Sequence, residues 1–192
     1  MDDVTALALA ARDGDRVALS DFIRGTWAEV GYLAAVLAGP DLAEDATQDT
    51  YVRALRALPG YRAESGARTW LLSIARRAAV DAVRGAARRR RLSRLLAGRA
   101  GARDAAQVPL ADGVLTYQVL SRLDLDRRTS FVLTQLMGFD YAAAADVCGC
   151  PVGTIRSRVA RARTQLVAEM GLTEAGAGTV VVAEPDEPPV RP

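Results

Sequence analysis

Helical periodicity runs through almost the whole chain, and this feature most limits the folds open to it. Apolar residues recur every three or four positions, and no segment shows the strict alternation of a half-buried strand. One such helical face consists of Leu19, Phe22, Ile23, Val30, Leu33 and Leu37. Gly39 and Pro40 are expected to end that helix. We therefore predict an all-α protein.

The same pattern divides the chain into two parts. A second helix is predicted over 41–58, "DLAEDATQDTYVRALRAL", with Asp41 as its N-cap, and a Pro- and Gly-containing loop follows over 59–68. A third helix starts near Thr69 and runs into a cluster of arginines. Helical pattern returns at about Val114 and lasts to about Met170. We predict helical domains at 1–92 and 113–171, a flexible linker at 93–112 and a disordered tail at 172–192.

Composition excludes several classes of function. The chain has two cysteines and no histidine, so it cannot complete a tetrahedral zinc site or form a Ser-His or Cys-His couple. It has no phosphate-binding loop motif, and we expect neither a metal nor a cofactor. No apolar run reaches the length of a membrane span, and the acidic start does not resemble a signal peptide, which predicts a cytoplasmic protein without membrane insertion. There Cys148 and Cys150 would stay thiols that pack around a turn.

Charge is distributed unevenly behind a net charge of only +2. Between Arg76 and Arg103 there are ten arginines and one acid, Asp81, so this segment carries 10 − 1 = +9 and the remainder 2 − 9 = −7. Such a block suggests a polyanionic partner, nucleic acid before membrane. All 25 basic residues are arginine, the side chain better suited to phosphate and guanine.

A second basic stretch, "CPVGTIRSRVARAR" (150–163), combines arginines with an apolar stripe. The stripe is formed by Ile155, Val159, Ala162 and Leu166. Before it, "FDYAAAADVCGC" has the pattern of a short helix capped by Asp140 and ended by Gly149, with Pro151 in the first turn of the next helix. A helix, a short turn with Gly and a basic helix make a helix-turn-helix pattern. The alternative is an ordinary helical hairpin with a solvated basic face.

Three segments together resemble the extracytoplasmic-function sigma factors of the sigma-70 family. "GFDYAAAADVCGCPVGTIRSRVARAR" resembles region 4, "DLAEDATQDTYVRAL" resembles region 2.2, and "YRAESGARTWLLSIARRAAVDAVR" resembles regions 2.3 and 2.4. The matches cover most of residues 5–170 in the family's order, and are similar to the actinobacterial sigma factor C group. The resemblance implies a first domain that binds core RNA polymerase and opens the −10 promoter element, and a second that reads the −35 element. Many family members also have an anti-sigma factor.

The resemblance and the residue pattern together give candidate sites. Asp45, Gln48 and Asp49 share one polar helix face, as either a solubility face or a polymerase-binding face, while Tyr51, Leu55 and Leu58 are expected to form a separate apolar face. On the third helix, Leu71, Ala75, Ala78 and Ala82 are expected to be buried. An arginine row of Arg77, Arg84, Arg88 and Arg91 would meet successive phosphates, provided that the helix continues through Gly85. The −10 candidates are Trp70, Ser73, Arg77, Arg84 and Arg88.

Individual roles within these sites differ. Trp70 either fills the core between helices or supports a pocket for a flipped −10 base. Family members often carry Asn where Arg77 stands, which leaves the −10 base preference open. For the −35 element the resemblance implies that Arg156, Ser157 and Arg161 contact bases or their phosphates, and that Thr154 and Arg158 hold the backbone.

Three alternative functions are weighed against that of a sigma factor. A self-sufficient helix-turn-helix regulator would explain the last sixty residues but not the acidic face or the long basic helix, and no dimerisation segment is visible. An RNA-binding helical protein and a hydrolase relying on carboxylates alone fit less of the sequence.

Overall fold

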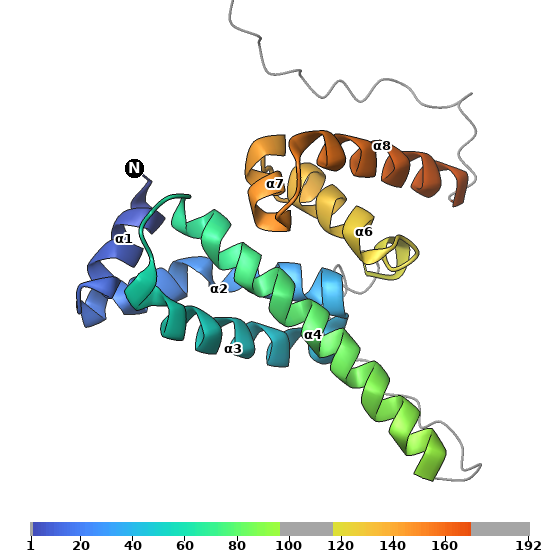
Figure 1. Ribbon diagram of the computed structural model, residues 1–192, viewed down its shortest axis with the longest axis horizontal. Helices are drawn as coiled ribbons and strands as arrows, with labels where there is room; N and C mark the ends of the chain where they lie inside the picture. The colour runs from blue at the N-terminus through green and yellow to red at the C-terminus, as the bar shows by residue number, and fades with distance from the viewer. Residues whose placement is uncertain (1, 97–116, 170–192) are drawn as a thin grey trace, which may run out of the picture.

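The computed structural model describes residues 2–96 and 117–169, with the side chains of the long fourth helix described as far as Ser93. Within these ranges the chain is all helical and contains no strand, as predicted. The first unit is a bundle whose members are α1 (Asp3–Arg12), α2 (Arg16–Ala38), α3 (Pro40–Ala57), the 3-10 turn η1 (Leu58–Gly60) and α4 (Ala67–Leu96) (Figure 1).

The helix ends follow from local chemistry. The Asp2 carboxylate accepts a hydrogen bond from the Thr5 amide at 2.7 Å and begins α1, and Asp15 caps α2 in the same way. The sharp corner between α2 and α3 is made by Gly39, at a φ of 92°, with Pro40 at the start of α3. The prediction that Asp41 is the N-cap of this helix was wrong, because Gly39 holds that position without any side-chain cap. Asp41 lies in the first turn, where its negative charge interacts favourably with the positive end of the helix dipole.

The core of the first unit lies between α2, α3 and α4. Leu33, Leu37, Leu71 and Leu72 are each almost completely buried. The Thr26 hydroxyl bonds the Tyr51 hydroxyl at 2.8 Å, which satisfies a polar pair inside this core. Of the predicted buried stripe of α4, Leu71, Ala75 and Ala78 are buried, whereas Ala82 is only half-buried.

The second unit is a smaller helical cluster that contains α6 (Leu125–Phe131), the π-helical turn η2 (Val132–Leu136), α7 (Tyr141–Cys148) and α8 (Val152–Glu169). Asp140 caps α7 and Gly149 ends it in a left-handed conformation at a φ of 64°, as predicted. Pro151 directly precedes α8, and its carbonyl accepts the Thr154 amide at 2.9 Å. The predicted stripe of α8 is the buried one: Ile155, Val159, Ala162 and Leu166.

The two units pack against each other, which the sequence pattern did not predict. The contacts join α4 to α7 and α2 to α6 (Figure 1). At their centre lies Arg128, which is 8 % exposed; its guanidinium donates to the carbonyls of Val36 and Leu37 in α2 and of Ser121 and Leu123 in its own unit. Burial lowers the pKa of Arg128. An arginine from the second unit thus satisfies carbonyls at the C-terminal end of α2.

The predicted linker and tail lie mostly outside the residues that the structure describes. Helix α4 continues through 93–96, the first positions assigned to the linker, and Gly85 does not interrupt it. The rest of the predicted linker, 97–112, and the predicted tail, 172–192, lie outside the described residues. None of the helices in the described ranges combines the length and the apolar character needed to cross a membrane.

Candidate nucleic-acid interface

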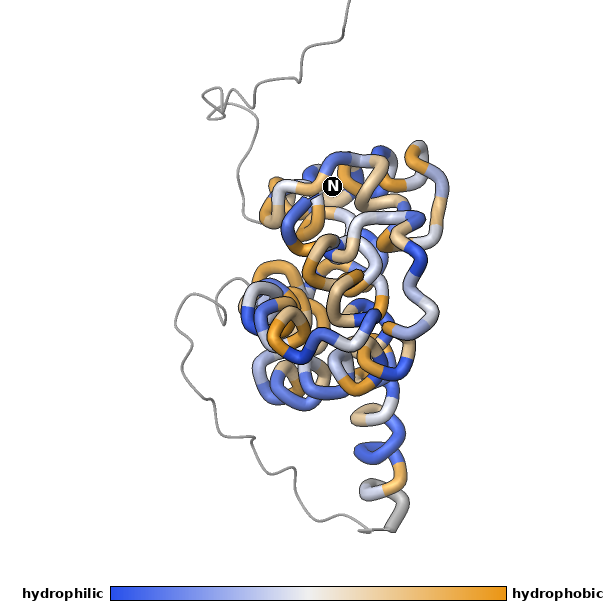
Figure 2. Tube along the Cα trace, turned by 90° about the vertical axis from the view of Figure 1, so that its left-hand side faces the viewer, coloured by the Kyte–Doolittle hydropathy of each residue, from blue (hydrophilic) through white to orange (hydrophobic). Residues whose placement is uncertain are grey.

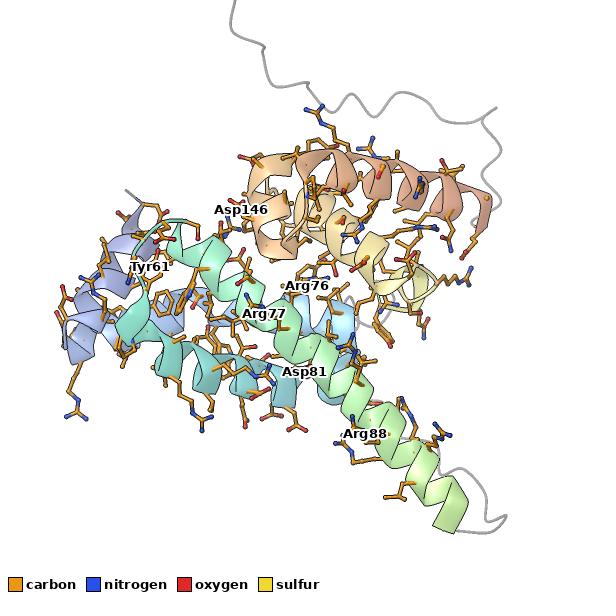
Figure 3. The ribbon with its side chains drawn as sticks, viewed as in Figure 1. Tyr61, Arg76, Arg77, Asp81, Arg88 and Asp146 are labelled. Atoms are coloured by element: carbon orange, nitrogen blue, oxygen red, sulfur yellow. The ribbon has the colours of Figure 1, made fainter. Side chains whose placement is uncertain are left out.

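The predicted −10 residues share one solvent-facing row along α4. Trp70, Ser73, Arg77, Arg84 and Arg88 follow each other at steps of three, four, seven and four residues, which keeps them on one side of a helix. The Ser73 hydroxyl donates to the Trp70 carbonyl at 2.7 Å, and Arg77 donates to the Ser73 hydroxyl at 3.3 Å. Both Arg77 and Arg88 are exposed (Figure 3). We call this set the α4 row.

A pocket opens at the N-terminal end of the α4 row. It has a volume of about 410 Å³, and its lining includes Tyr61, Arg62, Glu64, Ser65 and Trp70. The Tyr61 and Trp70 rings pack 4.9 Å apart, and the Tyr61 hydroxyl donates to the Ser65 carbonyl at 2.7 Å, which ties the loop across the pocket. Trp70 therefore packs on Tyr61 and also lines this open pocket, and its predicted role toward a −10 base stays a prediction.

The second basic surface is the outer face of α8. Arg156, Ser157 and Arg161 are exposed there, and Thr154 is half-buried. The Arg156 guanidinium lies 5.9 Å from the centre of the Tyr141 ring of α7, and the Ser157 hydroxyl donates to the Thr154 carbonyl at 2.9 Å. Because all four lie in the first ten residues of the helix, they stand at the end that recognition helices direct at base edges.

Arg158 faces inward, unlike the other predicted −35 residues. Its guanidinium donates to the Asp126 carboxylate at 2.6 Å, and the same carboxylate accepts from Arg76 of α4 at 2.8 Å. Arg158 also lies 3.6 Å from the sulfur of Cys150. Asp126 thus holds one arginine from each basic helix at the contact between the two units (Figure 3 labels Arg76).

The two cysteines lie beside this cluster. Both thiols are free, and burial raises the pKa of Cys148 to about 11. At neutral pH the Cys148 thiol is therefore protonated and a poor nucleophile, which fits a packing role in the turn before α8. No group of three or more His, Cys, Asp or Glu side chains capable of holding a metal occurs within 2–96 and 117–169.

The third candidate surface is the outer face of α3. Asp45 and Gln48 are exposed and Asp49 is half-buried, so the three predicted residues lie on the free side of the helix. The structure adds Val52 and Leu55 to this face, which are 45 % and 43 % exposed. The prediction that Leu55 joins Tyr51 and Leu58 in one apolar face was wrong, because the latter two are buried and Leu55 is not. We call these five residues, from Asp45 to Leu55, the α3 face.

Two further contacts border the α3 face. Arg53 pairs with Asp49 at 2.7 Å and with Asp81 of α4 at 2.7 Å. Such exposed pairs contribute only about 0–1 kcal/mol, so a partner can take the Asp49 carboxylate at little cost. On α2, the Trp27 ring is 46 % exposed and stacks on Tyr51 at 5.2 Å, next to Val52 in the chain. An acidic face with an apolar end is suited to binding a protein.

Ion pairing separates the arginines into two groups. Arg68, Arg76 and Arg158 each pair with a carboxylate. The Arg68 pair joins α4 to α2, the Arg76 pair joins α4 to α6 across the two units, and the Arg158 pair joins α8 to α6 within the second unit. In the described part of the chain, no ion pair engages the arginines of the α4 row or the outer face of α8, namely Arg77, Arg84, Arg88, Arg156 and Arg161. Exposed arginines without acids are suited to phosphates.

Sequence reasoning missed the residues that hold the units together. Asp126 and Arg128 lie in "LDLDRR", where nothing in the pattern distinguishes a buried arginine from an exposed one. Arg76 is next to Arg77 and was counted with it in the basic block, although only Arg77 is exposed. Val52 and Leu55 could have been predicted, because their spacing from Asp45 and Gln48 places all four on the same helix face.

Comparison with known proteins agrees with this geometry. The family model for sigma-70 region 2 matches residues 30–89, and the model for sigma-70 region 4 matches residues 114–166. The chain is 45 % identical over 172 residues to the ECF RNA polymerase sigma factor SigC of Mycobacterium tuberculosis, covering 86 % of this chain and 90 % of that protein. It is 35 % identical over 132 residues to the ECF RNA polymerase sigma factor EcfG of Rhodopseudomonas palustris, covering 67 % and 71 %.

Two solved structures share the fold along most of the chain. CnrH in complex with the cytosolic domain of CnrY superposes with a TM-score of 0.70 at 26 % identity, covering 88 % of this chain and 98 % of that one. The sigma factor RpoE of Bartonella quintana, in complex with the anti-sigma factor NepR, gives a TM-score of 0.65 at 29 % identity, covering 80 % and 97 %. The two regions, in this order on one chain, show that the protein belongs to the sigma-70 family and is an RNA polymerase sigma factor of the extracytoplasmic-function type, similar to SigC.

Proposed function

We propose a division of labour between the two units in promoter recognition. The first domain, 1–92, binds core RNA polymerase and opens the −10 element, and the second, 113–171, reads the −35 element, with 93–112 as the linker. The observation that carries this proposal is the pair of surfaces, one on α4 and one on α8, whose exposed arginines are engaged by no ion pair in the described ranges, in a sigma factor of this type. Because core polymerase works on the chromosome, we place the protein in the cytoplasm.

The α3 face is the proposed docking surface for core polymerase. Asp45, Gln48 and Asp49 supply charge and hydrogen-bond acceptors, and Val52 and Leu55 supply exposed apolar area next to them. A charged rim beside an apolar centre is the usual composition of a specific protein interface. This pairing of features favours binding over the solubility role that acids alone would suggest.

The α4 row and its pocket are the proposed −10 site. A base turned out of the stack would enter the pocket and lie against Trp70, while Ser73 and Arg77 stand at the pocket's edge. Arg84 and Arg88, farther along the row, would hold the phosphates of the strand as it separates.

The outer face of α8 is the proposed −35 site. Arg156, Ser157 and Arg161 are placed to contact bases or their phosphates, and Thr154 to hold the backbone. Arg158 can hold the backbone only after Asp126 releases it, since both of its terminal nitrogens are engaged in this structure.

An anti-sigma factor is a further proposed partner. CnrH and the RpoE of Bartonella quintana were each solved with a protein bound to them, in the second case a named anti-sigma factor. The similarity of this chain to both over at least 80 % of its length supports the same type of partner here. No cofactor is part of the proposal.

One experiment distinguishes the proposed sigma-factor function, which requires core polymerase, from that of a regulator that binds DNA by itself. Purified chain is mixed with a library of genomic promoter fragments with and without core polymerase, and transcripts and bound DNA are sequenced. We expect specific transcripts and specific binding only when core is present. Specific, tight promoter binding by the chain alone would contradict the proposal and favour the regulator.

The α4 row gives a prediction about promoter opening. Replacing Arg84 and Arg88 by Ala should reduce transcription from linear duplex far more than from a template with a pre-melted −10 bubble, because the bubble supplies the separated strands that the arginines stabilise. Replacing the exposed, unrelated Arg16 and Arg122 by Ala is the matched control. Equal losses on both templates would assign the pair to general phosphate attraction.

The α8 face gives a prediction about sequence preference. If Arg156 makes a bidentate contact to guanine, Arg156→Ala should cost about 1–3 kcal/mol and relax preference at a single −35 base pair. The measurement is holoenzyme binding to a set of −35 variants at fixed salt, with Arg163→Ala as the control. A uniform loss across the set would show a phosphate contact instead, and no loss would remove Arg156 from the site.

A further inference from the structure

The last turns of α4 project beyond the bundle as a basic arm. Among the described side chains of α4, Ala86 is the last buried one, and every residue from Ala87 to Ser93, which we call the arm, is exposed. The free end of α4 extends away from both units in Figure 1, and it is predominantly hydrophilic in Figure 2. Four consecutive arginines, Arg88 to Arg91, occupy the arm, and Leu92 is its one large apolar side chain.

Three of these four arginines form no ion pair within the described ranges. No ion pair involves Arg88, Arg90 or Arg91, and the one acid of α4, Asp81, is held by Arg53 of α3. Arg88 and Arg91 are three residues apart on one helix face, a spacing at which like charges destabilise a helix. The favourable effect of cations at a helix C-terminus extends only over the last turn, so it does not explain arginines that begin two turns before Leu96.

The directions in which the arm's arginines leave the helix favour a DNA groove over a membrane surface as the partner. Successive helix positions differ by about 100°, so Arg88 and Arg91 share one side of the helix and Arg90 leaves it on the other, whereas Arg89 lines the groove between α3 and α4 with Asp45, Asp49 and Asp81. A flat anionic surface such as a membrane would meet one side only. A DNA groove presents phosphates on two walls, and the major groove is wide enough to admit a helix.

We propose that the arm, through its arginines beyond Arg88, binds the phosphates of duplex DNA in the spacer between the two promoter elements, without reading sequence. This proposal rests on the proposed function, because it assumes that the Trp70 end of α4 lies at the −10 element. Arg91 lies 21 residues from Trp70, or about 32 Å along the helix, close to one turn of B-DNA at about 34 Å. The chain continues from α4 toward the domain proposed to read the −35 element, so the arm lies about one turn upstream.

The test compares holoenzyme containing wild-type chain with holoenzyme containing Arg90→Gln and Arg91→Gln, two arm residues outside the proposed −10 site. Each is titrated onto two promoter fragments, one natural and one with uncharged methylphosphonates through the first spacer turn upstream of the −10 element. On natural DNA, the slope of the logarithm of the binding constant against the logarithm of the salt concentration should be smaller in magnitude by about 1.8 for the variant. The ratio of wild-type to variant affinity should therefore fall about twelvefold between about 50 and about 200 mM salt. On the neutral spacer the two should bind equally.

Two results would overturn the proposal, and a control pair tests whether the effect is specific to the arm. A wild-type advantage of the same size on both fragments would overturn the proposal, because the arm would then act elsewhere, for example on polymerase or RNA. An unchanged salt slope in the variant would overturn it as well. The control pair Arg16→Gln and Arg122→Gln removes the same charge from exposed sites away from the arm, and it should behave as wild type on both fragments. Failure of the proposed function would instead show as wild-type holoenzyme that selects no promoter.

Discussion

Replacing Asp45 and Asp49 by lysine should abolish co-purification of the chain with core RNA polymerase, with a loss of affinity of at least a hundredfold, or about 3 kcal/mol. The substitutions change the local charge of the α3 face by four units, and like charges placed across an interface cost several kcal/mol. The measurement is a pull-down with tagged core, followed by titration. Helical circular dichroism should be unchanged, because neither side chain is buried.

The matched control reverses two acids elsewhere. Asp13, the residue that follows α1, and Asp146, on α7, are both exposed, so Asp13→Lys with Asp146→Lys changes the net charge equally without touching the α3 face. A separate variant, Leu55→Ser, tests the apolar end of the face and should weaken binding without any change of charge. Core binding that survives the Asp45 and Asp49 reversal would show that polymerase docks elsewhere on the chain.

Replacing Arg128 by methionine should lower the free energy of unfolding by about 2–4 kcal/mol and the melting temperature by about 5–10 °C. The guanidinium satisfies four carbonyls that methionine cannot, and unpaired buried carbonyls are costly. Part of the loss is offset, because burial of the charge is itself unfavourable, as the lowered pKa of Arg128 indicates. Since two of the carbonyls belong to α2, the second unit should also detach from the first.

Calorimetry and small-angle X-ray scattering measure the two effects. Arg127→Met is the matched control, because Arg127 is the adjacent residue and pairs only with Asp124 and Gln165 at a partly exposed position. Its effect should stay below about 1 kcal/mol. A melting temperature and a scattering profile that are unchanged in Arg128→Met would refute the structural role given to this arginine.

Much of the fold could be predicted from the sequence because local signals agreed with each other. The Asp140 cap, the Gly149 stop and the buried stripe that includes Ile155 and Val159 all follow from side-chain chemistry within a few residues. The cap of α3 could not be predicted in this way. Gly39 takes the N-cap position there because the chain must turn sharply between two packed helices, and this tertiary requirement overrides the local preference for Asp41.

The candidate site was predictable where a helix face is free, and not where two units meet. The α4 row needed only the spacing of its arginines and an unbroken helix at Gly85. The separation of Arg76 from Arg77, and of Arg158 from Arg156, depends on Asp126, a residue 50 positions away from Arg76 in the chain. Such a pairing has no local periodicity, so composition alone counts every arginine of the basic block as available to DNA.

The contact between the two units at Asp126 limits the length of promoter DNA that the protein can cover. Promoter elements centred near −10 and −35 are roughly 25 base pairs apart, which is about 85 Å along B-DNA at about 3.4 Å per base pair. Two units joined by the Arg76–Asp126 ion pair are in direct contact and cannot cover that span. The twenty residues of 97–116 could extend over at most about 66–72 Å, so the size of the units must make up the remainder. If, as proposed, the first unit binds the −10 element while the second binds the −35 element, the Arg76–Asp126 ion pair between the units must break, whereas the Asp126–Arg158 pair lies within the second unit and can persist.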